Sequence, residues 1–108
     1  MDVSPDGYAQ LIQEGILRAS FRESDTQPTP IKPGEIYQYE IDLWSTSYVV
    51  QPEHQIRVEI SSSNFPRFAR NLNTAHPFGT SDEIAVATQT IYHSTDYPSH
   101  ITLPVIPR

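Results

Sequence analysis

The fold is decided by residues 36–44, which read IYQYEIDLW. Apolar residues occupy alternate positions of this stretch, namely Tyr37, Tyr39, Ile41 and Leu43. Successive side chains of a β-strand point to opposite faces, so the alternation predicts a half-buried strand. We therefore expect Tyr37 and Tyr39 to lie in a hydrophobic core, and Trp44 to fall on the opposite face.

Other segments carry the same signal. Shorter alternating or β-branched runs predict strands at residues 17–22, 56–60, 86–93 and 100–105, whereas residues 8–13 fit either a strand or one helical turn. Turns rich in Pro and Gly separate these runs, and no segment keeps a helical period. Short antiparallel strands joined by such turns predict an all-β sandwich or jelly roll.

Composition excludes several classes of function. Of 108 residues, 7 are Lys or Arg and 13 are Asp or Glu, which gives a net charge of −6. Without clustered cations we expect no nucleic-acid partner. No apolar run or leader-like N-terminal segment is present, so we expect no membrane partner and favour the cytoplasm. The absence of Cys removes disulfides, thiolate metal sites and a Cys nucleophile.

Motifs for catalysis or metal binding are weak. Residues 79–83, GTSDE, begin like the G-x-S-x-G nucleophile elbow but end in Glu, and no helix is expected after them. We therefore expect Ser81 to stabilise a loop end. His93 and His100 could face each other, but two imidazoles are too few for a zinc site. The residues thus predict no catalytic residue, no cofactor and no metal ligand.

Aromatic residues support an alternative reading as a carbohydrate-binding β-sandwich module. A platform for sugar rings could be formed by Tyr37, Tyr39, Trp44, Tyr48 and Tyr92. We expect Tyr37 and Tyr39 to be core residues, so sugar binding would depend on exposure of Trp44 or Tyr48.

The long non-periodic stretch after residue 60 suggests a contact surface. Residues 61–74, SSSNFPRFARNLNT, present aromatic rings and guanidinium groups on an irregular loop, a combination suited to docking. The competing interpretation is that the Phe rings merely cover the end of a sandwich. The predicted domain-contact residues are Phe65, Arg67, Phe68, Arg70, Asn71 and Asn73.

Ordered sequence motifs run through nearly the whole chain. They are Ser4-Pro5-Asp6-Gly7, Gly15-Ile16-Leu17-Arg18-Ala19, Ile41-Asp42-Leu43-Trp44, His54-Gln55-Ile56-Arg57-Val58, Ser62-Ser63-Asn64-Phe65-Pro66-Arg67-Phe68, Arg70-Asn71-Leu72-Asn73-Thr74 and Leu103-Pro104-Val105-Ile106-Pro107. In this order they resemble the C-terminal domain of X-Pro dipeptidyl-peptidases and cocaine-esterase-type α/β-hydrolases.

The resemblance implies a fold and a role. It implies an antiparallel jelly-roll β-sandwich of galactose-binding-like topology, with residues 1–108 as its later part and its first strands before Met1. It also implies an accessory domain that packs on the α/β-hydrolase domain of a serine hydrolase, shapes the active-site surroundings and takes part in homo-oligomer contacts. None of the family's triad residues maps onto this chain.

One position departs from the resemblance. Glu53 stands where the family commonly has Gly before the His. A type I turn through Pro52 and Glu53 would tolerate this change, whereas a turn that needs positive φ would not.

Overall fold

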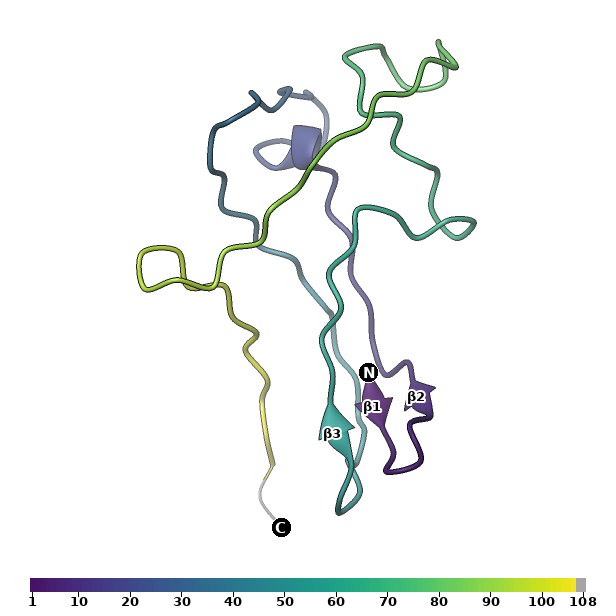
Figure 1. Cartoon of the computed structure of the whole chain (residues 1–108), viewed down its shortest axis with the longest axis vertical. Helices are drawn as coiled ribbons and strands as arrows, with labels where there is room; N and C mark the ends of the chain where they lie inside the picture. The colour runs from purple at the N-terminus through teal and green to yellow at the C-terminus, as the bar shows by residue number, and fades with distance from the viewer. Residues whose placement is uncertain (107–108) are drawn as a thin grey trace. The chain divides into compact units, whose positions relative to one another are not determined.

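The computed structural model describes residues 1–106 (Figure 1). These residues divide into two units, the first Met1–Arg70 and the second beginning at Asn71. Its regular elements are the strands β1 (Asp2–Val3), β2 (Ala9–Gln10) and β3 (Gln55–Ile56) and the 3-10 helix η1 (Ala19–Phe21). Within residues 1–106, no helix has the length and apolar character needed to span a membrane. Apart from the three-residue helix η1, the regular elements are strands, so the predicted all-β class is confirmed.

The three strands form one antiparallel sheet in the order β2-β1-β3. In the central strand, Asp2 pairs with Gln10 of β2 and with Ile56 of β3. The Ser-Pro-Asp-Gly turn of residues 4–7 connects β1 to β2, and Gly7 closes it with a backbone hydrogen bond of 2.9 Å. Gly7 has a φ of 89°, which glycine adopts without steric cost.

A buried carboxylate holds this sheet to the rest of the first unit. Asp2 is only 3% exposed. Its Oδ2 accepts a hydrogen bond of 2.8 Å from the Tyr48 hydroxyl, and both of its oxygens lie 3.0 Å from His54 Nδ1. Burial alone would raise the pKa of the Asp2 carboxyl. The hydrogen bonds from Tyr48 and His54 and the electrostatic attraction to His54 have the opposite effect and are together larger, so the pKa lies below its usual value.

The strand predicted at residues 17–22 is wrong, because this segment turns into η1. The Arg22 guanidinium donates to the carbonyl oxygen of Ala19 at 3.0 Å and to that of Thr29 at 2.7 Å. It also lies 4.5 Å from the centre of the Tyr37 ring. These contacts fold the chain back on itself, which an extended strand would not allow.

Regular strand pairing is also missing from most of the other predicted strands. Residues 36–44 and 100–105 contain no strand, residues 86–93 contain only the isolated bridge of His93 to Pro98, and the strand predicted at 56–60 ends at Ile56. These segments run as extended traces in Figure 1. Alternation fixes the extended conformation locally, but a strand also needs a neighbouring strand to accept its backbone hydrogen bonds.

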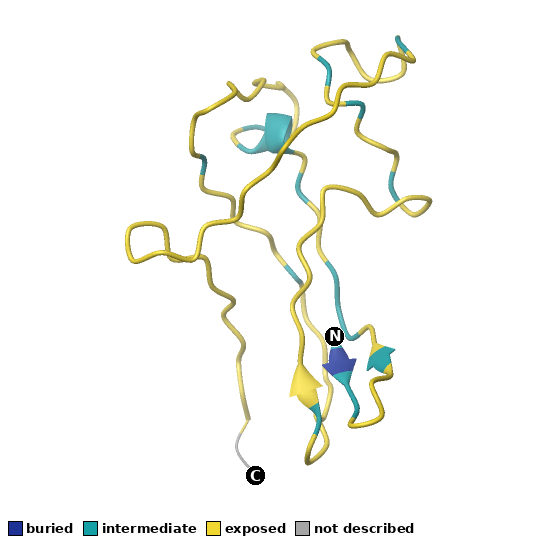
Figure 2. Cartoon of the chain, in the orientation of Figure 1, coloured by how far each residue is buried: buried dark blue, intermediate teal, exposed yellow. Residues whose placement is uncertain are grey.

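The expected hydrophobic core is likewise absent from residues 1–106, where no hydrophobic residue is buried (Figure 2). Tyr37 is half-buried, and Tyr39 is 40% exposed, so the prediction that both are core residues is wrong. Ile41, on the same predicted face, is 44% exposed. The alternating side chains remain open because no second layer covers them.

The turn before β3 takes the conformation that Glu53 tolerates poorly. His54 N–H donates to the Gln51 carbonyl at 3.2 Å, and Glu53 has a φ of 66°. Positive φ at the third position, after Pro52, identifies a type II turn, which favours glycine there. The tolerant type I alternative is therefore wrong, and Glu53 stores backbone strain.

The second unit is held by local contacts. Ala85 N–H donates to the Leu72 carbonyl at 2.9 Å, which joins two stretches of this unit. A separate turn is closed by the His93–Pro98 bridge, beside which the rings of Tyr92 and Tyr97 lie 5.3 Å apart.

The Asp2 network predicts a specific acid dependence of stability. Since the folded pKa lies below the usual 3.8, the network stabilises the chain above that pH and loses this contribution as the pH falls through the folded pKa. We expect the urea concentration at the unfolding midpoint to fall less steeply in Asp2→Asn than in the original chain when the pH is lowered from about 6 to about 2. The exposed Asp25→Asn is the control. An Asp2→Asn chain with the original acid limb would contradict this account.

The turn at Glu53 predicts a stabilising substitution. Glycine relieves the left-handed strain at the cost of a more flexible unfolded chain, so Glu53→Gly should raise the free energy of unfolding by about 0.5–1 kcal/mol. Urea denaturation measures the change. Glu40→Gly, in an extended stretch without positive φ, should instead destabilise. Equal changes in the free energy of unfolding for the two substitutions would show that Glu53 is not strained.

Candidate functional site

The predicted contact loop leaves β3 through polar side chains that bond to the backbone. Ser61 Oγ donates to the Ser63 carbonyl at 2.9 Å and accepts the Ser63 N–H at 3.2 Å. Phe68 N–H then donates to the Asn64 carbonyl at 3.0 Å, which closes a turn containing a cis Phe65–Pro66 bond. Hydroxyl and turn hydrogen bonds therefore replace ladder bonds in this part of the loop.

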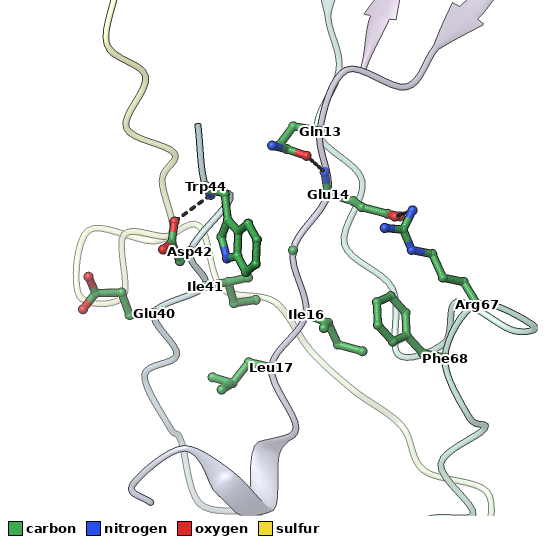
Figure 3. A pocket seen from close by; sticks show the side chains of 11 residues that line it. Gln13, Glu14, Ile16, Leu17, Glu40, Ile41, Asp42, Trp44, Arg67 and Phe68 are labelled. Carbon is green, nitrogen blue, oxygen red and sulfur yellow. Dashed lines mark hydrogen bonds and ion pairs between the residues drawn. The ribbon is translucent and has the colours of Figure 1, made fainter. Parts of the chain in front are cut away.

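Glu14 fastens this loop to the first unit. Its Oε2 accepts a hydrogen bond of 2.9 Å from Asn64 Nδ2, and its Oε1 forms an ion pair with the Arg67 guanidinium (Figure 3). The Glu14 side chain is 21% exposed and that of Arg67 is 64% exposed. Glu14 is not predictable from local sequence patterns, because its partners lie 50 or more residues away along the chain.

Close backbone packing positions the segment that carries Glu14. A Cβ added at Gly15 would lie 2.5 Å from the Asp42 carbonyl oxygen and 2.9 Å from Ile41 Cγ2. Only glycine therefore fits where residues 13–17 meet residues 40–44.

A pocket of about 540 Å³ lies beside this contact. It is lined by Gln13, Glu14, Gly15, Ile16, Leu17, Glu40, Ile41, Asp42, Trp44, Arg67 and Phe68. Trp44, on its border, is 84% exposed, as its predicted position off the core face allowed. The Tyr48 hydroxyl, by contrast, donates its hydrogen bond to Asp2.

The six predicted contact residues divide between the two units. In the first unit, the Arg67 guanidinium lies 5.7 Å from the centre of the Phe68 ring. Phe68 is half-buried, whereas Phe65 is 71% exposed and Arg70 is exposed. Phe65, Arg67 and Arg70 are thus the accessible members in the first unit.

Asn71 and Asn73 belong to the second unit, where their side chains stabilise the backbone. Asn71 Oδ1 accepts the Asn73 N–H at 3.1 Å, and Asn73 Nδ2 donates to the Ala85 carbonyl at 3.0 Å. Asn73 has a φ of 56°, which asparagine tolerates better than most residues.

Ser81 and two of the histidines considered as catalytic or metal-binding candidates form hydrogen bonds with nearby residues of the chain. Ser81 Oγ accepts the Glu83 N–H at 3.1 Å, which is the predicted role at a loop end. His76 Nε2 lies 2.9 Å from Glu83, and His100 Nδ1 lies 2.9 Å from the Pro98 carbonyl oxygen. Within residues 1–106, no three His, Asp or Glu side chains lie close enough together to hold a metal ion.

The Glu14 contacts predict how the loop responds to mutation. Ion pairs of this exposure contribute about 0.2–1 kcal/mol, so Glu14→Ala should increase the initial rate of trypsin cleavage after Arg67 by a factor of about 1.4 to 5. Mass spectrometry of the fragments measures the rate. Glu59→Ala removes the ion pair with Arg57 outside the loop and should leave that cleavage rate unchanged. An unchanged rate in Glu14→Ala would show that Glu14 does not restrain the loop.

Comparison with known proteins gives consistent matches over this chain. Cocaine esterase from Rhodococcus sp. (strain MB1 Bresler) is 44% identical over 110 residues, which cover 100% of this chain and 19% of that protein. Two proteins named as serine esterases, from Mycobacterium bovis and Mycobacterium tuberculosis, are each 33% identical over 122 residues, covering 97% of this chain and 18% of each relative. The chain thus spans about a fifth of the length of these relatives.

No solved structure matches the chain significantly. The family model described as the X-Pro dipeptidyl-peptidase C-terminal non-catalytic domain, however, matches residues 1–102. The family model covers the motifs from Ser4 to Thr74, and the match to cocaine esterase covers the whole chain. The chain therefore belongs to the family of X-Pro dipeptidyl-peptidase C-terminal non-catalytic domains.

Proposed function

We propose that the chain is the later part of an accessory jelly-roll β-sandwich, of galactose-binding-like topology, in a serine hydrolase that cleaves acyl esters or X-Pro peptides. The observation that carries this proposal is the set of alternating apolar side chains left open in a chain of this non-catalytic family. Such faces are stable in water only when another layer covers them.

The segment after β3 illustrates the need for a second layer. Ile56, Val58 and Ile60 lie on one face, and each is more than half exposed. On the other face, Arg57 and Glu59 form an ion pair of 2.8 Å. One apolar and one charged face is the pattern of a strand in a two-layer sandwich, whose inner face is covered by a second sheet. We propose that strands outside residues 1–108 supply that sheet.

The second unit supports the same role. Ile84 is 53% exposed and Val86 fully exposed, and Leu103 is 44% exposed. These residues lie in predicted strands at 86–93 and 100–105 or next to them. Burying β-branched and aliphatic side chains contributes about 1.5–3 kcal/mol each, so a covering layer would stabilise the chain substantially.

The loop of residues 61–74 is the proposed contact with the α/β-hydrolase domain. The contact residues are Phe65, Arg67, Phe68, Arg70, Asn71 and Asn73. Phe65 and Arg70 are exposed, whereas Arg67 is paired with Glu14. We propose Phe65 and Arg70 as the anchors, since aromatic and arginine side chains dominate binding energy at protein interfaces. Through this contact the domain would shape the active-site surroundings, and its other open faces could enter homo-oligomer contacts.

The parent activity is proposed from the relatives. One is named as a cocaine esterase and two as serine esterases. A serine hydrolase needs a nucleophile, a base and an orienting acid. We propose that these lie in the hydrolase domain of the parent chain, with none in residues 1–108.

Ester hydrolysis tests whether the catalytic residues lie in the parent enzyme outside residues 1–108. The 108-residue chain and the parent enzyme would each be assayed with a p-nitrophenyl acyl ester, with and without a serine-directed phosphonate. We expect phosphonate-sensitive hydrolysis from the parent and none from the chain. Phosphonate-sensitive activity in the chain would refute the accessory role.

Substitutions in the parent enzyme test the contact surface. Phe65→Ala with Arg70→Ala should lower the stability of the parent by about 2 kcal/mol and reduce kcat/KM, because interface anchors of this kind cost that much when truncated. Thermal unfolding and ester kinetics measure the two effects. The control, Tyr8→Ala with Arg57→Ala, removes an exposed aromatic ring and an arginine elsewhere in the first unit. Equal effects of the two double variants would exclude a specific contact at the loop.

A further inference from the structure

Trp44 is held outward by an unfavourable backbone conformation. It has a φ of 58°, a region in which a bulky side chain is strained. Asp42 Oδ1 accepts the Trp44 N–H at 2.6 Å and stabilises this conformation. The indole is 84% exposed on the border of the 540 Å³ pocket. A strained, exposed aromatic residue beside a pocket is a feature that suggests binding.

The groups around the indole differ from one side to another. Figure 3 shows the Asp42 carboxylate on one side of Trp44 and Gln13 on the other, with Ile41 next to the ring and Ile16 farther away, toward Phe68. Gln13 Nε2 makes only a long hydrogen bond, 3.4 Å, to the Ser45 carbonyl. Asp42 uses one carboxylate oxygen on the Trp44 N–H, which leaves acceptor capacity on the other. The pocket therefore combines an aromatic plane with polar groups at its border.

We propose that Trp44 and this pocket bind the pyranose ring of a neutral saccharide. A pyranose has a C–H face that stacks on an indole, and its ring hydroxyls both donate to a carboxylate and accept from an amide. A purely apolar ligand would instead desolvate Asp42 and Gln13 without replacing their hydrogen bonds. The pocket volume lies within the range of small-molecule sites, about 300–1,000 Å³. Arg67 and Phe68 of this pocket also belong to the contact loop proposed above, so the inference is carried by Trp44, Asp42 and Gln13, which lie outside that loop.

The sole Trp of the sequence provides a direct readout. The parent enzyme, in which the proposed covering strands are present, would be titrated with methyl β-D-glucopyranoside, and the emission of Trp44 would be taken as the difference from the Trp44→Phe variant of the parent. Glycerol, at matched hydroxyl concentration, is the control because it has hydroxyls but no ring face. We expect a saturable shift in emission with the glucoside, with a Kd of about 1–10 mM, and only a linear solvent effect with glycerol. Identical responses to both compounds, or no response, would overturn the proposal.

Saturation-transfer NMR on the glucoside extends the test to variants without Trp. Trp44→Ala should abolish transfer, and Trp44→Tyr, which keeps a smaller stacking ring, should retain weakened transfer. Asp42→Asn keeps the capping oxygen and should weaken binding severalfold by removing the charged acceptor. Tyr8→Ala removes an aromatic residue that is 67% exposed outside the pocket and should bind normally. Undiminished transfer in Trp44→Ala, or loss in Tyr8→Ala, would overturn the assignment.

Discussion

The Asp2 carboxylate is the contact on which the ordered part of the chain depends. It lies in the middle strand of the sheet and receives Tyr48 and His54 from a stretch some fifty residues away. A buried carboxylate without such partners would be strongly unfavourable, so the three side chains require one another. In a chain whose described residues bury no hydrophobic side chain, this polar cluster takes the place that a core has elsewhere.

Sequence patterns predicted the class of fold but not the pairing of strands. Alternation at residues 36–44 and 56–60 depends only on neighbouring positions, so it correctly indicates extended, two-faced segments. Whether such a segment becomes a ladder depends on a partner strand, which local patterns do not specify. The turn to η1 was missed for a related reason, because Arg22 reaches the Thr29 carbonyl across a Pro-rich loop that has no periodic signal.

The candidate site was predictable in its composition and not in its internal contacts. Aromatic and guanidinium groups in residues 61–74 led to the prediction of a contact loop, which stays a prediction. The alternation near Trp44 placed its ring on the face opposite Tyr37 and Tyr39, and the ring is 84% exposed. The sequence did not indicate that Glu14 binds Asn64 and Arg67, since contacts between distant carboxylates and donors leave no local pattern. The pairing of His54 with Asp2 was missed on the same grounds.

The charged face of the segment after β3 also bears on how an open apolar strand avoids aggregation. Ile56, Val58 and Ile60 would suit the dry interface of a cross-β stack. Stacking identical segments in parallel register, however, would align each Arg57 with Arg57 and each Glu59 with Glu59 of the next copy. The repulsion between like charges opposes that assembly while leaving the apolar face open to a different partner. The intervening charges thus oppose a fibril built from parallel, in-register copies of this segment.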